Sequence, residues 1–323
     1  MKKIVHLSNT PLVGAPGKLS YLCERNGYVS HSIVLSDYPE KSGLNNKFMK
    51  YSLLLDRRIP YLADQLRCYI EEADIIHIHN DFNLFHEFEW KSNQKFIYHI
   101  HSPLREGPVF IDKTKIFDIR FSKKLVVGQY HPRHYPDFIP VPNIVLGVPS
   151  KNLVVDDQPL RIMYSPTHTR GGRWNNKYSE ELNNVIESLV KTRHIEVVKP
   201  QSPLPQDVLL EVRRSCHVSI DEISTGAYHQ ISLEGLCAGN VVINNADYFS
   251  SFVLSSLVDA QEMPPFYLCN SSNFFKRISE LLVDYDLVRD YQEKSFQFFN
   301  KFLGAEKLFK IYDKIYLEVL SNE

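Results

Sequence analysis

The amino-acid sequence predicts an α/β protein with two doubly wound domains, each a parallel sheet covered by helices. Short apolar, β-branched runs alternate with amphipathic stretches of helical period, and this alternation is typical of parallel sheets with crossover helices. The alternation stops in a proline-rich, polar segment and then starts again. The length of 323 residues suits two domains of ordinary size.

The first half of the chain alternates strands with helices. Gly27 is a suitable stop for the first helix, and Leu62, Leu66 and Ile70 give the second its helical spacing. Strands are predicted at 3–7, 29–35, 74–79, 95–101 and 124–130, and helices at 18–26 and 59–72.

A proline-rich segment with Pro132, Pro136, Pro140 and Pro142 leads into a polar, irregular stretch over 148–158, and such composition marks a boundary. The alternation then resumes, with strands predicted at 161–164, 194–198, 217–220, 241–244 and 266–269 and helices at 179–191, 206–214 and 231–238. The rest of the chain to residue 320 is amphipathic and helical, with an interruption near Gly304. We predict domains over 1–150 and 151–290, with helices over 291–323 that pack back towards the N-terminal domain.

The charge balance excludes some classes of partner. Lys plus Arg number 37 and Asp plus Glu number 38, for a formal net charge of −1. Proteins that bind nucleic acid phosphates usually carry a basic excess. We therefore predict no nucleic acid partner, and expect any bound anion to be small and held locally.

The cysteines and the apolar runs of the sequence indicate the cellular compartment of the protein. The five cysteines are scattered and form no C-x-x-C pair, which predicts reduced thiols rather than disulfides or a zinc site. The N-terminal segment lacks the apolar core of a signal peptide, and no apolar run approaches the roughly 20 residues that span a bilayer. We expect a cytoplasmic protein, with peripheral association at the inner face of the membrane left open.

Two loops after predicted strands are candidate phosphate sites, because open parallel sheets bind ligands beyond the carboxyl ends of their strands. Gly14 and Gly17 lie in the loop after the first strand, where the backbone can approach a phosphate at the following helix N-terminus. This loop has neither a G-x-G-x-x-G nor a P-loop pattern. A tight turn explains it equally well.

The loop over 165–177 is the second candidate, and it carries a local excess of positive charge. It holds Arg170, Arg173, Lys177 and His168 beside two glycines. Arginine binds phosphate oxygens through a bidentate fork and lysine acts as a point charge, so these groups can stabilise a leaving diphosphate. The alternative is a solvated basic loop.

The segment over 219–244 predicts a strand, a loop, a short helix and a second strand. Glu234 lies one turn into that helix, whose N-terminal N–H groups can face a ligand. A carboxylate at this place can accept both hydroxyls of a ribose. Its alternative role is to complement the helix dipole.

This segment resembles the donor-binding signature of glycosyltransferase family 4, G-Y/F-G followed by L-E-A-M-A-x-G-x-P-V-I. The chain has Gly226, Ala227 and Tyr228, and then LEGLCAGNVVI over 233–243. The resemblance is strong over 217–244 and weak elsewhere. It implies the GT-B fold, in which two Rossmann-like domains face a cleft, with the acceptor in the N-terminal domain and a nucleotide-sugar donor in the C-terminal domain.

The resemblance also implies roles for individual residues. Glu234 matches the second glutamate of the E-x7-E pair, which holds the donor ribose, and Arg173 with Lys177 resembles the basic pair that grips the diphosphate. His101 matches a histidine that touches the donor sugar. The other implied donor contacts are Gly14, Gly17, Tyr228, Ser232 and Leu233.

One departure concerns the first glutamate of that pair, which normally orients the donor sugar. Its position is occupied by Gly226, and His229 replaces a glycine common in the same loop. Asp221, Glu222 or His229 then takes over the sugar contact, or donor handling differs, or activity is lost. We favour the first alternative, because Asp221 and Glu222 follow directly on a strand.

Four histidines form two H-x-H pairs, His77 with His79 and His99 with His101. A period of two places each pair on one sheet face. The nearby carboxylates lack a metal-ligand spacing, so we expect no metal and no cofactor besides the donor substrate. His77 and His99 are expected in the core, and His79 and His101 at the ligand edge.

These observations predict a metal-independent transferase that moves a sugar from a nucleoside diphosphate sugar to a hydroxyl of a glycan or lipid-linked acceptor. The resemblance implies retention at the anomeric carbon and a role in surface polysaccharide synthesis. A non-catalytic binding subunit, favoured by Gly226, and a nucleotide-sugar epimerase remain alternatives. Nothing in the sequence indicates an oligomeric state.

Overall fold

The structure is a computed structural model that describes residues 1–38, 50–102, 115–164, 180–191, 195–200 and 204–321. The chain divides into two compact units. Unit 1 holds Met1–Ile144 together with Glu306–Glu323, and unit 2 holds Val145–Ala305. The chain therefore changes units a few residues before the boundary expected at 150, and changes again at the start of the last helix, between Ala305 and Glu306.

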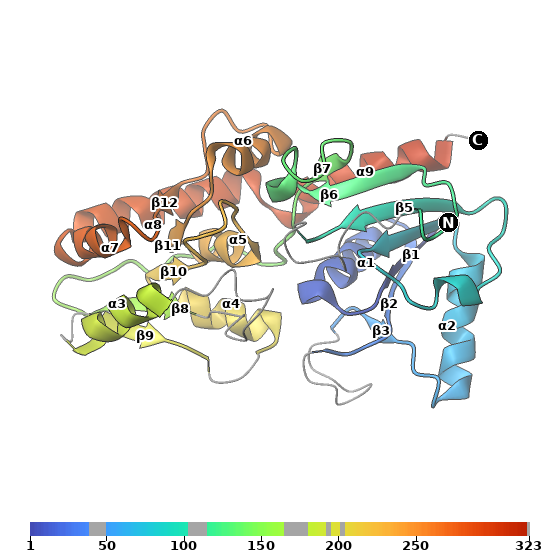
Figure 1. Ribbon diagram of the computed structural model, residues 1–323, viewed down its shortest axis with the longest axis horizontal. Helices are drawn as coiled ribbons and strands as arrows, with labels where there is room; N and C mark the ends of the chain where they lie inside the picture. The colour runs from blue at the N-terminus through green and yellow to red at the C-terminus, as the bar shows by residue number, and fades with distance from the viewer. Residues whose placement is uncertain (39–49, 103–114, 165–179, 192–194, 201–203, 322–323) are drawn as a thin grey trace. The chain divides into compact units, whose positions relative to one another are not determined.

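Unit 1 is a parallel sheet with helices packed on it (Figure 1). Its elements are β1 (Lys3–Ser8), η1 (Leu12–Gly14), α1 (Ala15–Arg25), β2 (Val29–Val34), β3 (Leu53–Leu54), α2 (Pro60–Glu72), β4 (Ile75–His79), η3 (Phe85–Glu87), β5 (Lys95–Ile100), β6 (Lys123–Val127), η6 (Gly128–Tyr130), β7 (Ile139–Val141) and α9 (Ala305–Ser321). The strand order is β3-β2-β1-β4-β5-β6-β7. The strand order reverses at β1, between β2 and β4, and such reversals are where open α/β sheets bind ligands.

The register of the unit 1 sheet aligns its histidines. His6 of β1 pairs with His77 of β4, and His79 pairs with His99 of β5. All of β4 is buried, as expected of a parallel strand covered on both faces. Helix α9 lies along this sheet (Figure 1), and Tyr316 of α9 reaches His77 with its hydroxyl 3.1 Å from Nδ1.

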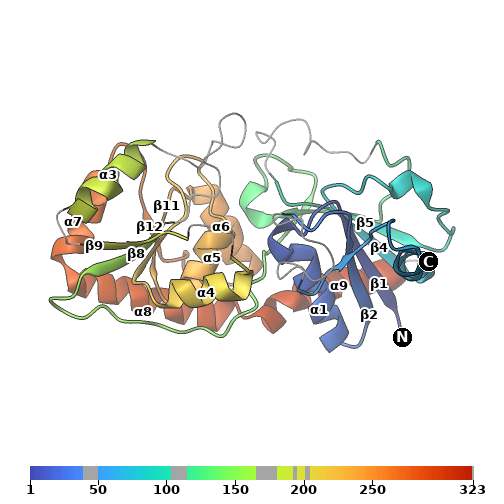
Figure 2. The same ribbon diagram turned by 90° about the horizontal axis from the view of Figure 1, so that it is seen from below.

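Unit 2 is an α/β unit of the same kind, with a smaller sheet of five strands. Its elements are β8 (Leu160–Tyr164), α3 (Glu180–Lys191), β9 (Ile195–Val198), α4 (Gln206–Arg214), β10 (Val218–Ile220), α5 (Gln230–Cys237), β11 (Val241–Asn244), α6 (Tyr248–Leu257), β12 (Phe266–Leu268), α7 (Phe274–Val283) and α8 (Tyr285–Phe302). The sheet order is β12-β11-β10-β8-β9, and all paired strands are parallel. Helix α8 runs along one side of this sheet (Figure 2).

The two sheets confirm the predicted fold class, an α/β chain with two doubly wound parallel sheets. Among the described elements, the strands β3 and β7, the helix α6 and the short 3-10 helices η1, η3 and η6 escaped the prediction. The helices set apart at 291–323 are divided between the units, because α8 belongs to unit 2 and Glu306 onwards belongs to unit 1. Among the described residues, no helix has both the length and the apolar character to cross a bilayer.

Candidate functional site

The loop after β1 forms one part of the candidate site in unit 1. Gly14 is the N-cap residue of α1. A Cβ atom on Gly17 would lie 2.8 Å from Ser52 Oγ and 3.1 Å from Tyr51 O, so close packing alone requires glycine there. The next residue, Lys18, is buried and donates from Nζ to Ile144 O over 3.1 Å. The predicted donor contacts of Gly14 and Gly17 stay predictions.

Five histidines gather on one face of the unit 1 sheet. His6, His77, His79 and His99 are fully buried, and His101 follows β5 half-buried. His79 and His101 approach with Nδ1 and Nε2 2.8 Å apart. The sequence analysis placed the two H-x-H pairs but missed His6, because a lone histidine in a strand gives no signal without the register of β1 against β4.

Burial keeps these imidazoles neutral at physiological pH. It lowers the pKa of His101 to about 3, with the charge of Lys18 as a second, smaller cause. It also lowers the pKa of His6 to about 3, and neighbouring histidines assist burial in holding the pKa of His79 well below its usual value. The cluster is therefore a set of hydrogen-bond donors and acceptors, without net charge.

Two groups in this cluster have the ligand type of a metal site. They are His6, His77 and His79, and then His79, His99 and His101, with the ligand atoms of each group within 4.8 Å of one another. Neutral imidazole binds zinc, copper and nickel. Both groups use His79, whose two ring nitrogens already face His6 and His101. The expectation that no metal is required stays a prediction.

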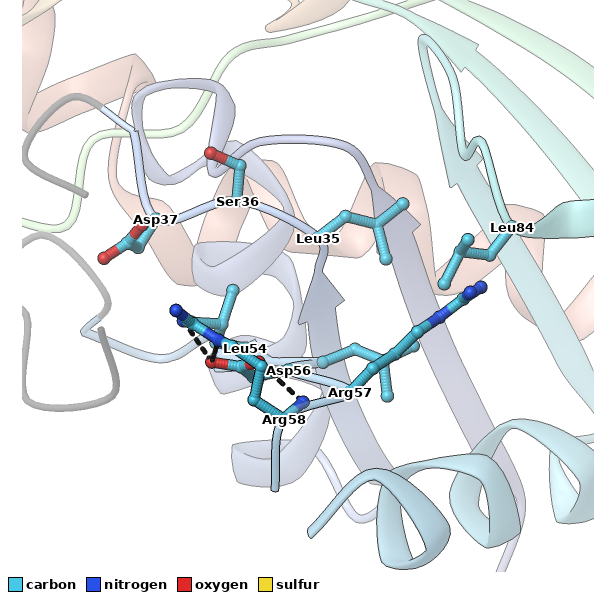
Figure 3. A pocket seen from close by; sticks show the side chains of 9 residues that line it. Leu35, Ser36, Asp37, Leu54, Asp56, Arg57, Arg58 and Leu84 are labelled. Atoms are coloured by element: carbon cyan, nitrogen blue, oxygen red, sulfur yellow. Dashed lines mark hydrogen bonds and ion pairs between the residues drawn. The ribbon is translucent and has the colours of Figure 1, made fainter. Parts of the chain in front are cut away.

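A cavity of about 480 Å³ opens just beyond the ends of β2 and β3 (Figure 3). Its lining residues are Leu35, Ser36, Asp37, Leu54, Leu55, Asp56, Arg57, Arg58 and Leu84. Arg58 donates to both carboxylate oxygens of Asp56, over 2.8 and 2.6 Å, and this pairing lowers the pKa of Asp56 to about 2. The sequence gives no sign of this polar hollow, because β3 has only two residues.

In unit 2, Asp221 organises the start of α5. Its Oδ2 accepts from His229 N and Ser232 Oγ, both over 2.7 Å, and its Oδ1 lies 3.2 Å from His229 Nδ1. The other ring nitrogen of His229, Nε2, is buried and has no hydrogen-bond partner among the described residues. Asp221 therefore fixes the His229 ring, while Nε2 stays without a partner among the described residues.

Glu222 and Gly226 shape the loop between β10 and α5. Glu222 is fully buried, and its Oε2 accepts from the backbone N–H groups of Ser224 and Thr225, both over 2.6 Å. Gly226 has a φ of 75° and its carbonyl accepts from Asp247 N. Residues other than glycine rarely adopt such a φ. The backbone at this position therefore disfavours the glutamate that the family signature has there.

Glu234 is part of a buried ion pair. Its Oε2 lies 3.3 Å from Arg213 Nε, and its Oε1 accepts from Gln206 Nε2 over 2.8 Å. Both charged side chains are at most 2% exposed. Arg213 does not stand out in the sequence, since its position at the end of α4 gives no sign of a partner in α5. The ribose contact of Glu234 stays a prediction, because both oxygens have partners within unit 2.

The other predicted donor residues have varied surroundings. Tyr228 and Leu233 are buried, and burial raises the pKa of the Tyr228 phenol. Ser232 accepts from Asn244 Nδ2 over 2.9 Å while it donates to Asp221. Arg173 and Lys177 lie outside the described residues, so their roles stay predictions.

Comparisons with known proteins concern the fold. No protein family model and no curated protein sequence matches the chain. Among solved structures, sucrose-phosphate synthase from Thermosynechococcus elongatus superposes with a TM-score of 0.64 at 12% identity, and covers 100% of both chains. WaaG, a glycosyltransferase of lipopolysaccharide biosynthesis, superposes with a TM-score of 0.52 at 11% identity, over 97% of this chain and 99% of its own.

A third structure is an α-glucosyltransferase in complex with UDP and a 13-mer DNA. It superposes with a TM-score of 0.68 at 11% identity, over 98% of this chain and 100% of its own. The chain therefore has the GT-B fold of these glycosyltransferases.

This last likeness corrects the expectation that the chain has no nucleic acid partner. Several structures of the α-glucosyltransferase with the same fold hold DNA together with UDP or UDP-glucose. The expectation was wrong because net charge averages over the whole surface, whereas DNA contacts depend on where the basic residues lie.

Proposed function

We propose that the protein is a glycosyltransferase that moves a sugar from a nucleoside diphosphate sugar to an acceptor hydroxyl, with retention at the anomeric carbon and without an obligatory metal ion. The biological role that we propose is the synthesis of a glycan or a surface polysaccharide. The observation that carries the proposal is the Asp221–His229 pair at the start of α5, with His229 Nε2 buried and without a described partner.

The pair supports His229 as the residue that contacts the donor sugar. A buried nitrogen without a hydrogen bond costs about 1–3 kcal/mol, and a sugar hydroxyl bound there would remove that cost. Asp221 holds the ring through Nδ1, as carboxylates do when they orient a histidine for a ligand. Glu222 is fully buried against its own loop, which makes it the weaker candidate for this contact.

The leaving diphosphate needs positive charge. The proposal gives this role to Arg173 and Lys177 of the basic loop, with support from the N-terminal end of α5. Groups that stabilise developing charge in a site from which water is excluded act without reorganisation during the reaction. A metal ion is then dispensable for the departure of the nucleotide.

The first experiment combines a donor panel with an acceptor panel. UDP-, GDP- and dTDP-sugars are tested for nucleotide release, in chelator, with oligosaccharides, lipid-linked saccharides and hydroxymethylated duplex DNA as acceptors. Turnover in chelator and an NMR spectrum that shows the donor's anomeric configuration in the product support the proposal. An absence of both nucleotide binding and release across the panel contradicts it.

The second experiment replaces His229. We expect His229→Phe to lower kcat/KM about tenfold or more, since each ~1.4 kcal/mol of lost transition-state stabilisation is tenfold in rate. His217→Phe is the matched control, because His217 is equally buried, at 6%, and bonds the backbone N–H of Arg161. Equal activity in His229→Phe and the wild type contradicts the assignment.

A non-catalytic binding subunit is the second candidate, and Gly226 favours it. The position carries no carboxylate and its backbone does not suit one. Nucleotide-sugar binding by calorimetry without turnover on any acceptor would support this candidate over the transferase.

A further inference from the structure

Three of the five histidines in unit 1 form a continuous string that begins at a thiol. Cys23 Sγ lies 3.9 Å from His6 Nε2, at the long end of sulfur hydrogen bonds. His6 Nδ1 lies 3.0 Å from His79 Nε2, and His79 Nδ1 lies 2.8 Å from His101 Nε2. The string runs from helix α1 across β1 and β4 to the residue that follows β5.

A neighbouring histidine in the same cluster stays outside the string. His77 stacks on His79 with ring centroids 4.1 Å apart, but its Nδ1 bonds Tyr316 Oη over 3.1 Å. His77 therefore shares the burial of the string but bonds none of its three rings, and it is connected to Cys23 only through the Tyr316 hydroxyl.

A neutral imidazole carries one N–H and one lone pair. A hydrogen bond between two ring nitrogens needs an N–H on one ring and a lone pair on the other. The tautomer of each ring therefore fixes the tautomer of the next. Only two arrangements satisfy the whole string: all three rings protonated on Nδ1, or all three on Nε2. In the first, each bond points from Cys23 towards His101, and in the second each points back.

We infer that Cys23, His6 and His79 are positioning residues that fix the tautomer of His101, with the proton on Nδ1 in all three rings. A thiol is a weak donor and a weak acceptor, whereas an imidazole lone pair is a good acceptor, so the bond S–H···N is favoured over N–H···S. Burial raises the pKa of the Cys23 thiol, which keeps its proton available. The nitrogen left over at the end of the string is then an N–H donor, Nδ1 of His101.

The string therefore decides which ligand atoms His101 can bind. An Nδ1–H group selects an oxygen acceptor, such as a sugar hydroxyl oxygen or a phosphate oxygen, over a group that can only donate. This last step rests on the proposed function, because it assumes that a sugar nucleotide reaches His101. The common tautomer of the three rings does not depend on that function.

The test is the protonation of each ring in the whole protein, read from ¹⁵N–¹H correlation spectra of histidine-labelled samples at neutral pH. The expected result is Nδ1–H in His6, His79 and His101. Mixed tautomers among the three rings, or Nε2–H in all of them, would overturn the inference. Loss of these signals with one equivalent of Zn²⁺ would assign the rings to a metal site and overturn it also.

Variants separate the string from simple packing. We expect His6→Phe to leave His101 in a mixture of tautomers, and His77→Phe, a change of the same size in the same cluster, to leave it on Nδ1. Equal effects of the two variants would contradict a role for the string. If either variant fails to fold, the wild-type spectra still decide the question.

Activity is a separate readout. If the transferase activity is found, His6→Phe is expected to raise KM for the donor severalfold more than His77→Phe does. If His6→Phe has the same KM for the donor as the wild type, the string has no effect on donor binding. The spectra would still test the common tautomer of the three rings. An inactive wild-type protein would instead count against the proposed function alone.

Discussion

Arg213 and Glu234 form an ion pair in the interior of unit 2, with Arg213 Nε 3.3 Å from Glu234 Oε2 and each side chain at most 2% exposed. Arg213 also donates from Nη1 to Ser219 Oγ over 3.3 Å, and Asn240 donates to the same Oγ over 2.8 Å. The pair thus joins α4 and α5 to strand β10. Any variant of Glu234 that is meant to test nucleotide binding also tests this network.

Replacing Glu234 with Ala is expected to destabilise unit 2 by about 3–5 kcal/mol, because it leaves the Arg213 charge buried without its partner. The double variant Glu234→Leu with Arg213→Met should recover much of that loss. The measurement is urea unfolding of the three proteins. Equal midpoints for the wild type and Glu234→Ala would mean that the ion pair contributes little, and Glu234 would then be available for a ribose.

The stability of unit 1 is expected to fall as the pH is lowered below about 6.5. Burial holds the pKa of His6 and His101 at about 3, whereas an unfolded histidine titrates near 6.5. As the pH falls below about 6.5, the unfolded chain therefore binds more protons than the folded chain does. Each such histidine then lowers the free energy of unfolding by about 1.4 kcal/mol per pH unit, down to its pKa in the folded protein. Above about 6.5 this contribution is constant.

The acid transition can be followed through Trp90, whose ring stacks on Phe85 in unit 1. In a Trp174→Phe background, urea midpoints read from Trp90 fluorescence should fall between pH 7 and pH 5. Replacement of His6 by Phe should reduce the slope, because it removes one of these buried imidazoles. A midpoint that stays constant over this range would contradict the neutral, buried cluster.

Introducing glutamate at position 226, as in the family signature, is not expected to create the donor-sugar contact of that signature. Gly226 has a φ of 75°, and a residue with a Cβ atom in this conformation costs about 1–2 kcal/mol. We expect Gly226→Glu and Gly226→Ala to lower the melting temperature to a similar extent. Higher turnover in Gly226→Glu than in Gly226→Ala would show that the carboxylate, once present, does reach the donor.

The basic loop gives the most direct test of diphosphate binding. Lys177→Ala is expected to lower turnover strongly while the melting temperature stays unchanged, since the residue is proposed to bind only the leaving group. Lys191→Ala, at the last turn of α3, is the control. Turnover in Lys177→Ala equal to that of the control would remove Lys177 from the site.

The sequence predicted the elements whose residues repeat a regular pattern. The strand at β4, with the sequence IIHIH, and the helix at α4 were placed almost to the residue. Helix α6 was missed, because its serines and aromatics have no amphipathic period, and its start depends on Asp247 accepting from Ser250 N over 2.9 Å. The two-residue strand β3 is too short for any period to be visible.

The sequence indicated some of the candidate site residues, for physical reasons. His101 and Asp221 were singled out because polar residues that follow a strand stand out in the sequence. Their partners His79 and His229 were also singled out, but which ring nitrogen meets which partner atom depends on ring orientation. His6 and Arg213 become visible only when strands and helices far apart in the sequence come together.

Helix α9 follows the whole of unit 2 in the sequence, yet it belongs to unit 1. Tyr316 of this helix bonds His77, and Tyr312 donates to Pro142 O over 2.7 Å. Because α9 is synthesised after unit 2, unit 1 cannot complete its packing until the whole of unit 2 has been made.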